Sequence, residues 1–597
     1  MRTQIALGVA RSLSGRRWVW RETEERLGLG IAEQLGVPEI VGRMLAVRGV
    51  TTETAGDFLD PTLRALLPDP SRLADMDRAA ARIAAAVVRE EKVAVFGDYD
   101  VDGACAGALL VSVLGALGLE AMGYVPDRIA EGYGPNKAAL SRLVERGARL
   151  IICADCGSGA GEVFAAIAGR ADVIVLDHHK TDALPGAHGA PLIALVNPSR
   201  PDDRSGIGAV SATAIAFLAM VALLRLLRRQ GFFAARAEPD LLSLLDLVAL
   251  ATVCDVMPLS GLNRALVAQG LKVMARRRRP GIAALLAVAE VSGSPTAESC
   301  GYALGPRINA AGRIAEADLG LRLLLAPDEG AAAPLARALD GVNRQRQQVE
   351  AAVLEAAMAA AAAQAEAGLP VLLVSGAGWH PGVVGIVAGR IKERFNRPAC
   401  VLGLGGEGEP DLAKGSGRSV PGFDLGAAVL AAREIGLLEA GGGHAMAAGF
   451  SLAASRLAAF HSFLNERLGA AASLPTVADL AIEGTVAVPG ASAELAVALG
   501  RLAPFGAGNA EPVLVLPRIR VMRANRVGAS GRTIRVTVSG EDGGRLEAVA
   551  FRSTEEALAP ALLERAGRPL HLAGHLRLDR WNGTNAPRFV ITDAALA

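Results

Sequence analysis

The sequence predicts an α/β protein in which a parallel sheet carries the chemistry, a second α/β domain follows, and a small β-barrel comes last. Three patterns predict this class. From Val93 onward, short β-branched strands alternate with helical stretches, an order typical of a parallel sheet with helices on both faces. Residues 328–368 are rich in Ala, Glu, Gln and Arg and predict one long helix that joins the two α/β domains. Residues 477–597 show short alternating strands with Gly-rich turns, which favour a barrel of the OB type.

These patterns divide the 597 residues into five segments. An N-terminal segment and a catalytic α/β domain come first, and a connector that contains the long helix follows. The second α/β domain and the OB-type barrel come after the connector. The expected boundaries are 1–70, 71–270, 271–368, 369–472 and 473–597.

Composition and charge exclude several classes of protein. The 62 basic residues nearly cancel the 61 acidic ones, so a site for a polyanion must be a local basic patch. Six Cys residues in apolar contexts are typical of a reduced, cytoplasmic protein. The N-terminus has no continuous apolar run, which argues against a secretory signal. The apolar stretch 207–224 is long enough to span a bilayer, but Gly208, Ser211 and Thr213 interrupt it, so we expect a buried helix and no membrane contact.

Candidate catalytic residues follow four apolar runs that are expected to be strands. Because the working residues of a parallel α/β sheet lie just past the carboxyl ends of its strands, we expect these side chains to converge. Clustered carboxylates raise one another's pKa unless a cation compensates them. Oxygen and imidazole ligands without thiolates favour Mn²⁺ or Mg²⁺ over a structural Zn²⁺. The candidates are Asp98, Asp100, Asp102, Asp155, Asp177, His178, His179 and Asp255.

Parts of this pattern have other interpretations. A single Asp after a strand, such as Asp155 or Asp255, is often only a turn or helix-cap residue. The Asp-rich run 98–103 resembles part of a calcium loop, but Leu109 stands where that loop requires Glu. The two cysteines of the CADC run (153–156) have the spacing of a redox or zinc pair. Since no second Cys pair accompanies them, we expect two buried thiols beside the strand end.

Basic and glycine-rich motifs indicate phosphate contacts. Four arginines have guanidinium groups suited to bidentate phosphate contact: Arg128, Arg307, Arg313 and Arg418. For each of them, an ordinary arginine on the protein surface is the alternative interpretation. A glycine loop at 441–443 before His444 permits close approach of an anion, with a plain tight turn as the alternative. The aromatics beside these motifs either stack on bases or pack in the core: Tyr99, Tyr133, Trp379 and Phe423. Nothing ties the arginine run 276–279 to the site, and we expect a solvated helix end there.

The strand-end motifs belong to an ordered set of sequence blocks that covers nearly the whole chain. The set includes VFGDYDVDG (95–103), IICADCGSG (151–159), VLDHHK (175–180), ATVCDVMPL (251–259), GPRINAAGRI (305–314), KGSGRSVPGFDL (414–425) and GGGHAMAAGF (441–450). It resembles the DHH phosphoesterase family, which is named for the triplet at 177–179. Within that family the chain is similar to the exonucleases specific for single-stranded DNA.

The resemblance implies a two-metal phosphodiesterase with a parallel-sheet DHH domain, a DHH-associated domain that binds phosphate or DNA, and an OB domain that binds DNA. Its cofactor would be two ions of Mn²⁺ or Mg²⁺, held by Asp98, Asp100, Asp155, His178 and Asp255. Asp155 would bridge the ions and His179 would lie beside the scissile phosphate. Asp102 is placed with the catalytic residues, and its part as a ligand is left open. The implied substrate-binding residues are Arg128, Tyr133, Arg307, Asn309, Arg313, His380, Ser416, Arg418, Ser419, Gly442, Gly443 and His444.

The implied activity is 5′ to 3′ degradation of single-stranded DNA to mononucleotides in recombination and repair. A monomer that works with a helicase and a single-strand-binding protein is expected, with Arg580 of the barrel important only for long strands. A phosphodiesterase for small nucleotides or short oligoribonucleotides is the first alternative, but it would need no OB domain. A catalytically inactive binding protein is the second, but it would have lost metal-ligand positions that are all filled in this chain.

Overall fold

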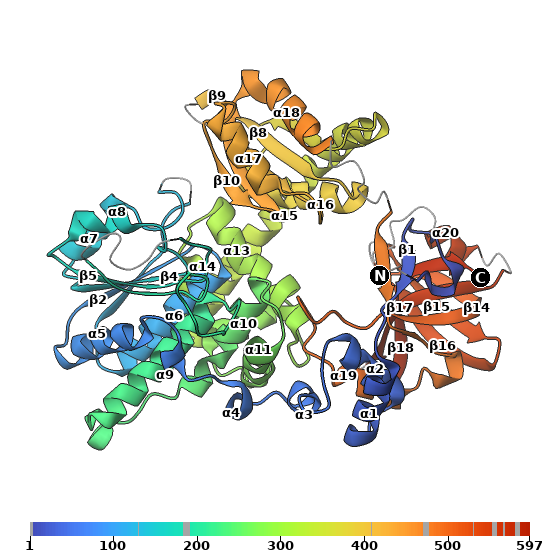
Figure 1. Cartoon of the computed structure of the whole chain (residues 1–597), viewed down its shortest axis with the longest axis horizontal. Helices are drawn as coiled ribbons and strands as arrows, with labels where there is room; N and C mark the ends of the chain where they lie inside the picture. Colours follow the sequence, from blue (N-terminus) through green and yellow to red (C-terminus); the bar gives the residue numbers. More distant parts are fainter. Residues whose placement is uncertain are drawn as a thin grey trace. The chain divides into compact units, whose positions relative to one another are not determined.

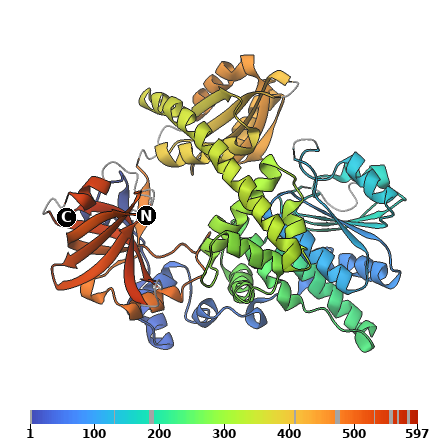
Figure 2. The ribbon, with the colours of Figure 1, turned by 180° about the vertical axis from the view of Figure 1, so that it is seen from behind.

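The structure is a computed structural model of the chain, and two compact units compose it. It describes residues 4–128, 131–182, 191–406, 409–469, 477–528, 531–551, 558–564, 568–579 and 585–597. Residues 1–340 together with 479–597 form the first unit, and residues 341–478 form the second. Helix α15 (Glu329–Glu366), the predicted long helix, begins in the first unit and continues into the second as one uninterrupted helix (Figure 2). The predicted fold class is confirmed.

The catalytic domain is built on a five-stranded sheet in which every pairing is parallel. The strand order is β3-β2-β4-β5-β6, so the chain moves outward from β2 first to one side and then to the other. The crevice at such a switch point is where ligands bind in open α/β sheets. The strands are β2 (Val93–Gly97), β3 (Ala121–Tyr124), β4 (Leu150–Ala154), β5 (Asp172–Leu176) and β6 (Leu192–Val196).

Helices cover both faces of this sheet, because successive strand residues alternate between two cores. Val95 and Ile152 belong to the larger core with the first group of helices, whereas Phe96 and Cys153 belong to the smaller core with the second. Figure 1 shows α5 and α9 on one side of the sheet and α7 and α8 on the other. The first group is α5 (Met76–Val88), α6 (Val101–Ala116) and α9 (Ala212–Arg229), and the second is α7 (Lys137–Glu145) and α8 (Gly161–Phe164).

Helix α9 contains most of the apolar stretch that we expected to be a buried helix. No helix in the described part of the chain is both long and apolar enough to cross a membrane. The side chain of Ser211 caps α9 by accepting a hydrogen bond from Ala214 N, and Arg228 and Arg229 lie in its last turn. The polar residues before Ala212 therefore mark the capped start of this helix, and its last turn carries charges that suit the helix dipole.

A helical region follows the sheet and corrects one expectation. The apolar run before Asp255 was expected to be a strand, but it forms the buried helix α10. A run that is apolar all round fits a buried helix as well as a buried strand, and its ten residues suit the helix. The region comprises α10 (Leu245–Cys254), α11 (Gly261–Met274), α12 (Pro280–Val288), the π-helix η6 (Ser299–Leu304), α13 (Gly305–Ile314) and α14 (Leu319–Leu324).

The second unit has a mixed five-stranded sheet of order β10-β11-β9-β8-β7. Helix α16 packs with residues of α15 against the face of β7 and β8 that carries Ala399 and Val401, and α17 covers the opposite face. Its elements are β7 (Leu372–Ala377), α16 (Pro381–Phe395), β8 (Ala399–Gly406), β9 (Glu409–Arg418), α17 (Leu425–Glu434), β10 (Ala440–His444), β11 (Ala447–Ala453) and α18 (Leu457–Gly469).

The C-terminal region contains a closed five-stranded barrel. Its strands are β14 (Leu514–Val527), β15 (Thr533–Gly540), β16 (Gly543–Ala550), β17 (Leu570–Asp579) and β18 (Ala586–Leu596). The ring order β14-β15-β16-β18-β17 closes through antiparallel pairing of β17 with β14, and β16 pairs with β18 in parallel. This topology, with helix α20 (Leu558–Leu563) between the third and fourth strands, is that of an OB-type barrel. Arg580, the residue expected to contact long strands, lies outside the described residues.

The N-terminal segment packs against this barrel, a contact that the sequence patterns do not predict. Strand β1 (Arg17–Trp20) pairs in parallel with β12 (Asp479–Ile482), and the buried indole of Trp18 donates a hydrogen bond to Asp593 at 2.9 Å. Helices α1 (Glu25–Leu35) and α2 (Glu39–Val47) share a hydrophobic core with the barrel strands. The two ends of the chain therefore stabilise one another within the first unit.

Candidate active site

Carboxylate and imidazole side chains gather at the carboxyl end of the parallel sheet. They follow β2 and β4, the strands that flank the switch point, and the neighbouring β5, and Asp255 joins them from the end of α10. Three overlapping groups form, and the ligand-type atoms within each group lie within 4.8 Å of one another. The groups are Asp98, Asp100 and Asp155; Asp102, His178 and Asp255; and Asp155, Asp177, His178 and His179.

The loop after β2 holds its carboxylates through the start of α6. The side chain of Asp100 caps this helix by accepting a hydrogen bond from Gly103 N at 3.0 Å. A Cβ at position 103 would lie 2.4 Å from both the nitrogen and the oxygen of Asp98, so only glycine fits there. The DYDVDG sequence thus folds tightly and leaves Asp98 and Asp100 next to the end of β4.

Asp102 differs from its neighbours because its oxygens are already engaged. It is buried and accepts hydrogen bonds from Ala212 N at 2.6 Å, Thr213 N at 2.9 Å and the Thr213 hydroxyl at 2.6 Å. A carboxylate at the N-terminus of a helix satisfies free N–H groups and interacts favourably with the helix dipole. These contacts favour a positioning role that fastens α9 to α6, and the catalytic role of Asp102 stays a prediction.

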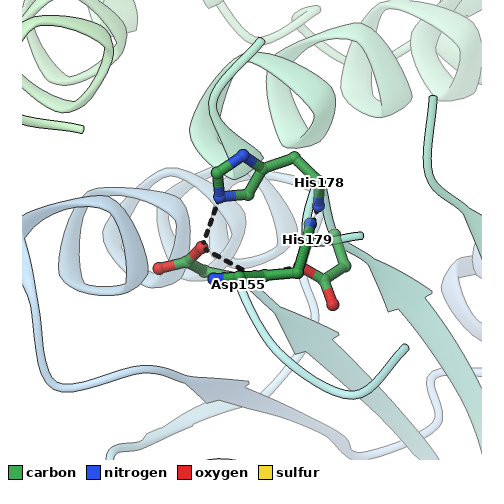
Figure 3. A group of neighbouring side chains, drawn as sticks. Asp155, His178 and His179 are labelled. Atoms are coloured by element: carbon green, nitrogen blue, oxygen red, sulfur yellow. Dashed lines mark hydrogen bonds and ion pairs between the residues drawn. The ribbon is translucent and has the colours of Figure 1, made fainter. Parts of the chain in front are cut away.

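Asp155 and His178 form the centre of the cluster (Figure 3). The imidazole Nε2 of His178 lies 3.2 Å from Asp155 Oδ1 and 3.4 Å from Asp255 Oδ2. Asp155 itself has φ of +64°, in the left-handed region that non-glycine residues seldom adopt. Backbone strain of this kind concentrates at functional sites, where it aims a side chain. Three separate elements thus direct polar groups to one point.

Asp177, the first residue of the DHH triplet, organises the turn that presents the two histidines. It is buried, and its Oδ1 accepts from the backbone nitrogens of His178 and His179 at 2.8 and 3.2 Å. The same oxygen lies 2.8 Å from His179 Nδ1, and Oδ2 accepts from Ser158 N at 3.1 Å. Burial would raise the pKa of Asp177, but the hydrogen bonds and charge of His179, together with the hydrogen bond from Ser158, outweigh it and hold the pKa below its usual range. Asp177 therefore sets the orientation of His179.

The electrostatics of the cluster call for a cation. Burial, reinforced by the charge of Asp100, raises the pKa of Asp98 to about 8. Burial also raises the pKa of Asp255 to about 8, with Asp102 and Asp100 adding to the effect. The pKa of Asp155 rises well above its ordinary value through burial and the charges of the surrounding carboxylates. Several buried carboxylates this close together repel one another, and divalent cations remove that repulsion.

The donor set fits hard divalent cations. Asp98 Oδ1 and Asp255 Oδ2 are buried and have no hydrogen-bond partner among the described residues. Buried carboxylate oxygens are almost always paired, so these two oxygens point to ligands. Cys153 and Cys156 are free thiols in the core beneath α7, as expected, and contribute no sulfur ligand. Oxygen and imidazole ligands of this kind suit Mn²⁺ or Mg²⁺.

Aromatic and basic residues lie along the rim of the cluster. The guanidinium of Arg128 stacks 5.1 Å from the ring centre of Tyr99, a cation–π contact. The hydroxyl of Tyr133 donates to the backbone oxygen of Asp155 at 3.2 Å and lies 3.3 Å from His179 Nδ1. Tyr133 is 54% exposed, so its ring remains accessible at the mouth of the site. His179 completes this rim. Burial lowers its pKa, but the hydrogen bond and the charge of Asp177 raise it, and the pKa is about 9.

The predicted residues of α13 are placed differently from one another. Asn309 accepts a hydrogen bond from Val101 N at 3.2 Å and so anchors α13 to the metal-ligand loop. Arg307 donates to Asp340 at 3.0 Å and to Ala303 O at 2.7 Å, so a phosphate would compete with an existing ion pair. Arg313 is half-buried and follows Gly312, where a Cβ would lie 2.6 Å from Tyr99 O. The structure thus brings Asn309 to the metal-ligand loop, places Arg313 directly after a residue that packs on Tyr99, and gives Arg307 a bracing role in the helical region.

Four of the predicted residues of the second unit share one face of its sheet. The register aligns Arg418 with Ala447 and His444, and it aligns Ser416 with Gly449 and Gly442. Directly opposite residues of antiparallel strands point to the same face. A Cβ at Gly442 or Gly449 would meet no atom within 4 Å, so the row of Ser416, next to that of Arg418 and His444, is an open glycine floor. A polyanionic backbone could approach the sheet closely there.

Several details of the second unit correct or qualify the sequence analysis. The glycine run was expected to be a loop, but it forms the edge strand β10, which pairs with β11. Gly443 has φ of +152°, and a Cβ there would lie 2.4 Å from Ala447 O, which explains the glycine. The ring nitrogen of His380 accepts from Gly382 N at 3.0 Å and caps α16, while the buried hydroxyl of Ser419 donates to Phe423 O at 2.7 Å. Their substrate contacts stay predictions.

The aromatics are divided between rim and core. Phe423 is buried in the core of the second unit and cannot stack on a base. Trp379 packs over Gly376 and Gly403, where a Cβ would collide with the indole ring or its backbone. Tyr99 and Tyr133 contact each other edge-on with ring centres 6.5 Å apart beside the cluster. Of the four, Tyr133 is thus the aromatic best placed to meet a nucleotide.

Sequence reasoning missed two residues that support the histidines. Asn197 donates from Nδ2 to the backbone oxygen of His179 and to the Ser158 hydroxyl, both at 2.8 Å. The hydroxyl of Ser199 donates to His178 O at 2.8 Å. Asn197 directly follows β6, and the rule of polar residues at strand ends could have found it. Ser199 carries no such signal.

Comparison with known proteins places this arrangement in a family. Family models match for the N-terminal domain of the DHH family at residues 92–252, the DHHA1 domain at 368–470 and the RecJ OB domain at 482–593. The single-stranded-DNA-specific exonuclease RecJ of Bacillus subtilis is 32% identical and aligns over 97% of this chain and 71% of its own length. The RecJ of Escherichia coli is 35% identical over 93% of this chain and 95% of its own length. The chain belongs to the RecJ family.

Solved RecJ structures share the fold. A crystal structure of RecJ in complex with Mn²⁺ from Thermus thermophilus superposes with a TM-score of 0.77 at 30% identity, covering 96% of this chain and 78% of that chain. A structure of exonuclease RecJ bound to manganese matches with a TM-score of 0.55 at 32% identity, covering 68% of this chain and 96% of that chain. The RecJ-family domain order, DHH, DHHA1 and OB, is therefore present in this chain.

Proposed function

We propose that this chain is a metal-dependent exonuclease that degrades single-stranded DNA from its 5′ end to mononucleotides, in recombination and repair. The observation that carries the proposal is the convergence of carboxylates and imidazoles at the switch point, where two buried carboxylate oxygens have no hydrogen-bond partner among the described residues. An OB-type barrel in the same unit supports single-stranded DNA as the substrate over small nucleotides. Relatives whose names state this specificity align over nearly the whole chain.

We assign the metal ligands from the three overlapping groups. Two ions of Mn²⁺ or Mg²⁺ would be held by Asp98, Asp100, Asp155, His178 and Asp255. Asp155 and His178 each belong to two of the groups, and Asp155 is the bridging ligand in this proposal because its carboxylate offers two oxygens. When bound, such ions lower the pKa of a water molecule and neutralise the charge on the attacked phosphate. Solved RecJ structures with Mn²⁺ and with Mg²⁺ support this choice of metals.

The remaining residues of the rim would hold the strand rather than the metal. His179, fixed by Asp177, would contact the scissile phosphate. Arg128 would contact a flanking phosphate, and Tyr133 would stack on the terminal base. Each of these side chains is held by a neighbouring residue before the substrate binds. Binding therefore costs little side-chain conformational entropy.

A cavity of about 1300 Å³ in the first unit offers a path for the strand. Its lining includes Cys254 and Asn309, which adjoin Asp255 and the loop after β2, and Arg501 and Phe505 of the C-terminal region. Tyr302, 84% exposed, also lines it. Aromatic rings and cations along a groove are the features that hold single strands without regard to sequence. We therefore route the strand from the metal centre through this cavity toward the OB domain.

A substrate panel tests the activity. We expect mononucleotides to be released from 5′-labelled and 3′-labelled single-stranded DNA in the presence of Mn²⁺ or Mg²⁺, and not after chelation. Cyclic dinucleotides and short oligoribonucleotides should be hydrolysed far more slowly. Faster hydrolysis of either small substrate would favour the phosphodiesterase alternative.

Blunt double-stranded DNA should be a poor substrate. Stacking on protein aromatics requires unpaired bases, and each base held in this way contributes about 1–3 kcal/mol. We therefore expect the rate on a blunt duplex to be lower by roughly tenfold or more than on the same strand alone. Comparable initial rates on the two forms would contradict the proposal.

Replacing Arg418 with Ala should weaken DNA binding and spare the metal centre. One charge-assisted contact contributes on the order of 1.5–3 kcal/mol, which is about one to two decades in affinity. The salt dependence of binding should also fall by about one phosphate. Fluorescence anisotropy with labelled single strands at several salt concentrations measures both effects, and metal content should stay unchanged.

Arg433 provides the matched control for this experiment. It lies on α17, which covers the other face of the same sheet. Its guanidinium donates a hydrogen bond to the backbone oxygen of Gly441 at 3.1 Å. Arg433→Ala should therefore bind DNA like the unchanged protein. If Arg418→Ala binds normally across all salt concentrations and loses only turnover, the residue acts on the transition state and the anchoring role is wrong.

The cellular setting belongs to the proposal as well. Because the substrate is a single strand, a helicase would supply it and a single-strand-binding protein would cover it. We place the enzyme in the cytoplasm as a monomer. Sedimentation of the purified protein with and without single-stranded DNA tests the oligomeric state.

A further inference from the structure

A second cavity, of about 710 Å³, opens at the far ends of the helices that lead to the metal-ligand cluster. Its lining includes Leu245 and Asp246, the first residues of α10, whereas Asp255 follows the last residue of that helix. At the rise of an α-helix, about 13 Å of helix separates Asp246 from Asp255. Helix α11, which supplies another wall, lies beside α10 (Figure 1). This cavity is therefore distinct from the site described above.

The arginine run after α11 forms one rim of this cavity. Arg277 adopts left-handed backbone geometry with φ of +51° and donates from its guanidinium to Val291 O. Arg279 forms an ion pair with Asp246 at 3.0 Å. Arg276 and Arg278 are exposed, and neither guanidinium has a hydrogen-bond or ion-pair partner within the described ranges. The expectation of a solvated helix end is thus right for Arg276 and Arg278 and wrong for the two arginines that are bonded.

The charges around the cavity are predominantly positive. Lys272, in the last turn of α11, is exposed, and among the described residues its ammonium group donates a hydrogen bond only to Gln269, at 3.4 Å. Two carboxylates line the cavity as well. Asp246 is neutralised by Arg279, and the exposed Asp240 accepts a hydrogen bond from Leu242 N. Lys272, Arg276 and Arg278 are left to attract an anion.

Aliphatic side chains line the rest of the cavity. Leu242 is 57% exposed at its edge, although it is a large apolar residue. An exposed apolar side chain beside a concave surface is typical of a binding site. The other aliphatic residues of the lining are Leu63, Leu245, Val273, Leu324 and Leu325.

We propose that this basic cavity binds an acidic peptide segment of a partner protein, with an apolar side chain of the peptide inserted against the aliphatic lining. The three unneutralised cations complement acidic side chains, and the aliphatic wall complements the apolar one. A nucleic acid fits less well, because none of the described residues that line the cavity is aromatic and bases would find no ring on which to stack. The position at the opposite end of α10 lets such a peptide bind while DNA is degraded.

Synthetic peptides test the proposal on the full-length protein. The probe is a labelled peptide with four Asp or Glu residues followed by two Leu residues. One comparison peptide replaces the acidic residues with Asn and Gln, and the other replaces Leu with Ser. We expect measurable binding by fluorescence anisotropy for the first peptide, weakened by salt, and binding weaker by roughly tenfold or more for each comparison peptide.

Two variants and one control locate the binding site. Arg276→Glu/Arg278→Glu should weaken binding of the acidic peptide by roughly tenfold or more, and Leu242→Ser by several-fold. Lys272→Glu, on the exposed face of α11, serves if the double variant does not fold. The matched control is Arg146→Glu/Arg170→Glu, which reverses two exposed arginines elsewhere on the same domain and should bind the peptide normally.

Each outcome decides the question. Failure of the unchanged protein to bind the acidic peptide, or equal loss of binding in the control variant, would overturn the proposal. If Arg276→Glu/Arg278→Glu loses affinity for labelled single-stranded DNA and keeps its affinity for the peptide, the cavity is a DNA surface instead. The exonuclease rate of that variant on short single strands is expected to stay within about twofold of the unchanged rate.

Discussion

Replacing Asp155 with Asn is expected to reduce hydrolysis of single-stranded DNA by about three orders of magnitude or more. The charge stabilisation that bound ions supply amounts to several kcal/mol, and losing the bridging carboxylate loses most of it. Asn is the right substitute because Asp155 has φ of +64°, a conformation that Asn tolerates better than Ala. The loss can then be attributed to the missing charge rather than to the backbone. Single-turnover rates with Mn²⁺ measure it.

The metal dependence of stability separates this effect from misfolding. Since ions that bind only the folded state stabilise it, Mn²⁺ should raise the melting temperature of the unchanged protein more than that of Asp155→Asn. Asp172→Asn serves as the control, because Asp172 lies at the opposite end of β5 in an ion pair with Arg82 at 2.6 Å. That variant should keep nearly the full rate. A folded Asp155→Asn protein that hydrolyses DNA at a near-normal rate would show that Asp155 does not bridge the ions.

The metal-ligand cluster was predictable because its geometry follows from local rules. Polar residues that directly follow apolar strands meet at one edge of a parallel sheet, whatever the details of packing. That rule alone brings Asp98, Asp155 and His178 together. It gave Asp255 the right location for the wrong reason, since this residue ends a buried helix. Apolar runs without periodicity do not distinguish the two kinds of element.

Contacts between distant parts of the chain were not predictable. The hydrogen bonds from Thr213 to Asp102 and from Val101 to Asn309 join residues more than one hundred positions apart, and they decide which polar side chains hold helices. The glycine run at 441–443 was misjudged for a related reason. Three glycines have no side chains to show strand alternation, and only pairing with β11 makes them a strand.

Replacing His179 with Ala should reduce turnover by about two to four orders of magnitude and leave the metal content nearly unchanged. The imidazole is 41% exposed and is fixed 2.8 Å from Asp177 Oδ1, so it lies at the mouth of the site with its orientation already set. His178→Ala is the comparison, because His178 lies between Asp155 and Asp255 and its loss should remove metal as well as activity. Metal analysis of the purified variants and single-turnover rates measure the two effects.

Asp177→Asn tests whether Asp177 acts through His179. The amide keeps an oxygen that can accept from the backbone nitrogens of the turn but loses the charge that orients the imidazole, so turnover should fall by about 10–100-fold. If the two residues work as one, the double variant Asp177→Asn/His179→Ala should be no slower than His179→Ala alone, because groups that act together are non-additive. Additive losses would mean that Asp177 supports the site in another way, through Ser158 and the turn itself. Loss of metal from His179→Ala equal to that from His178→Ala would instead make His179 a ligand and move the phosphate contact to Arg128 and Tyr133.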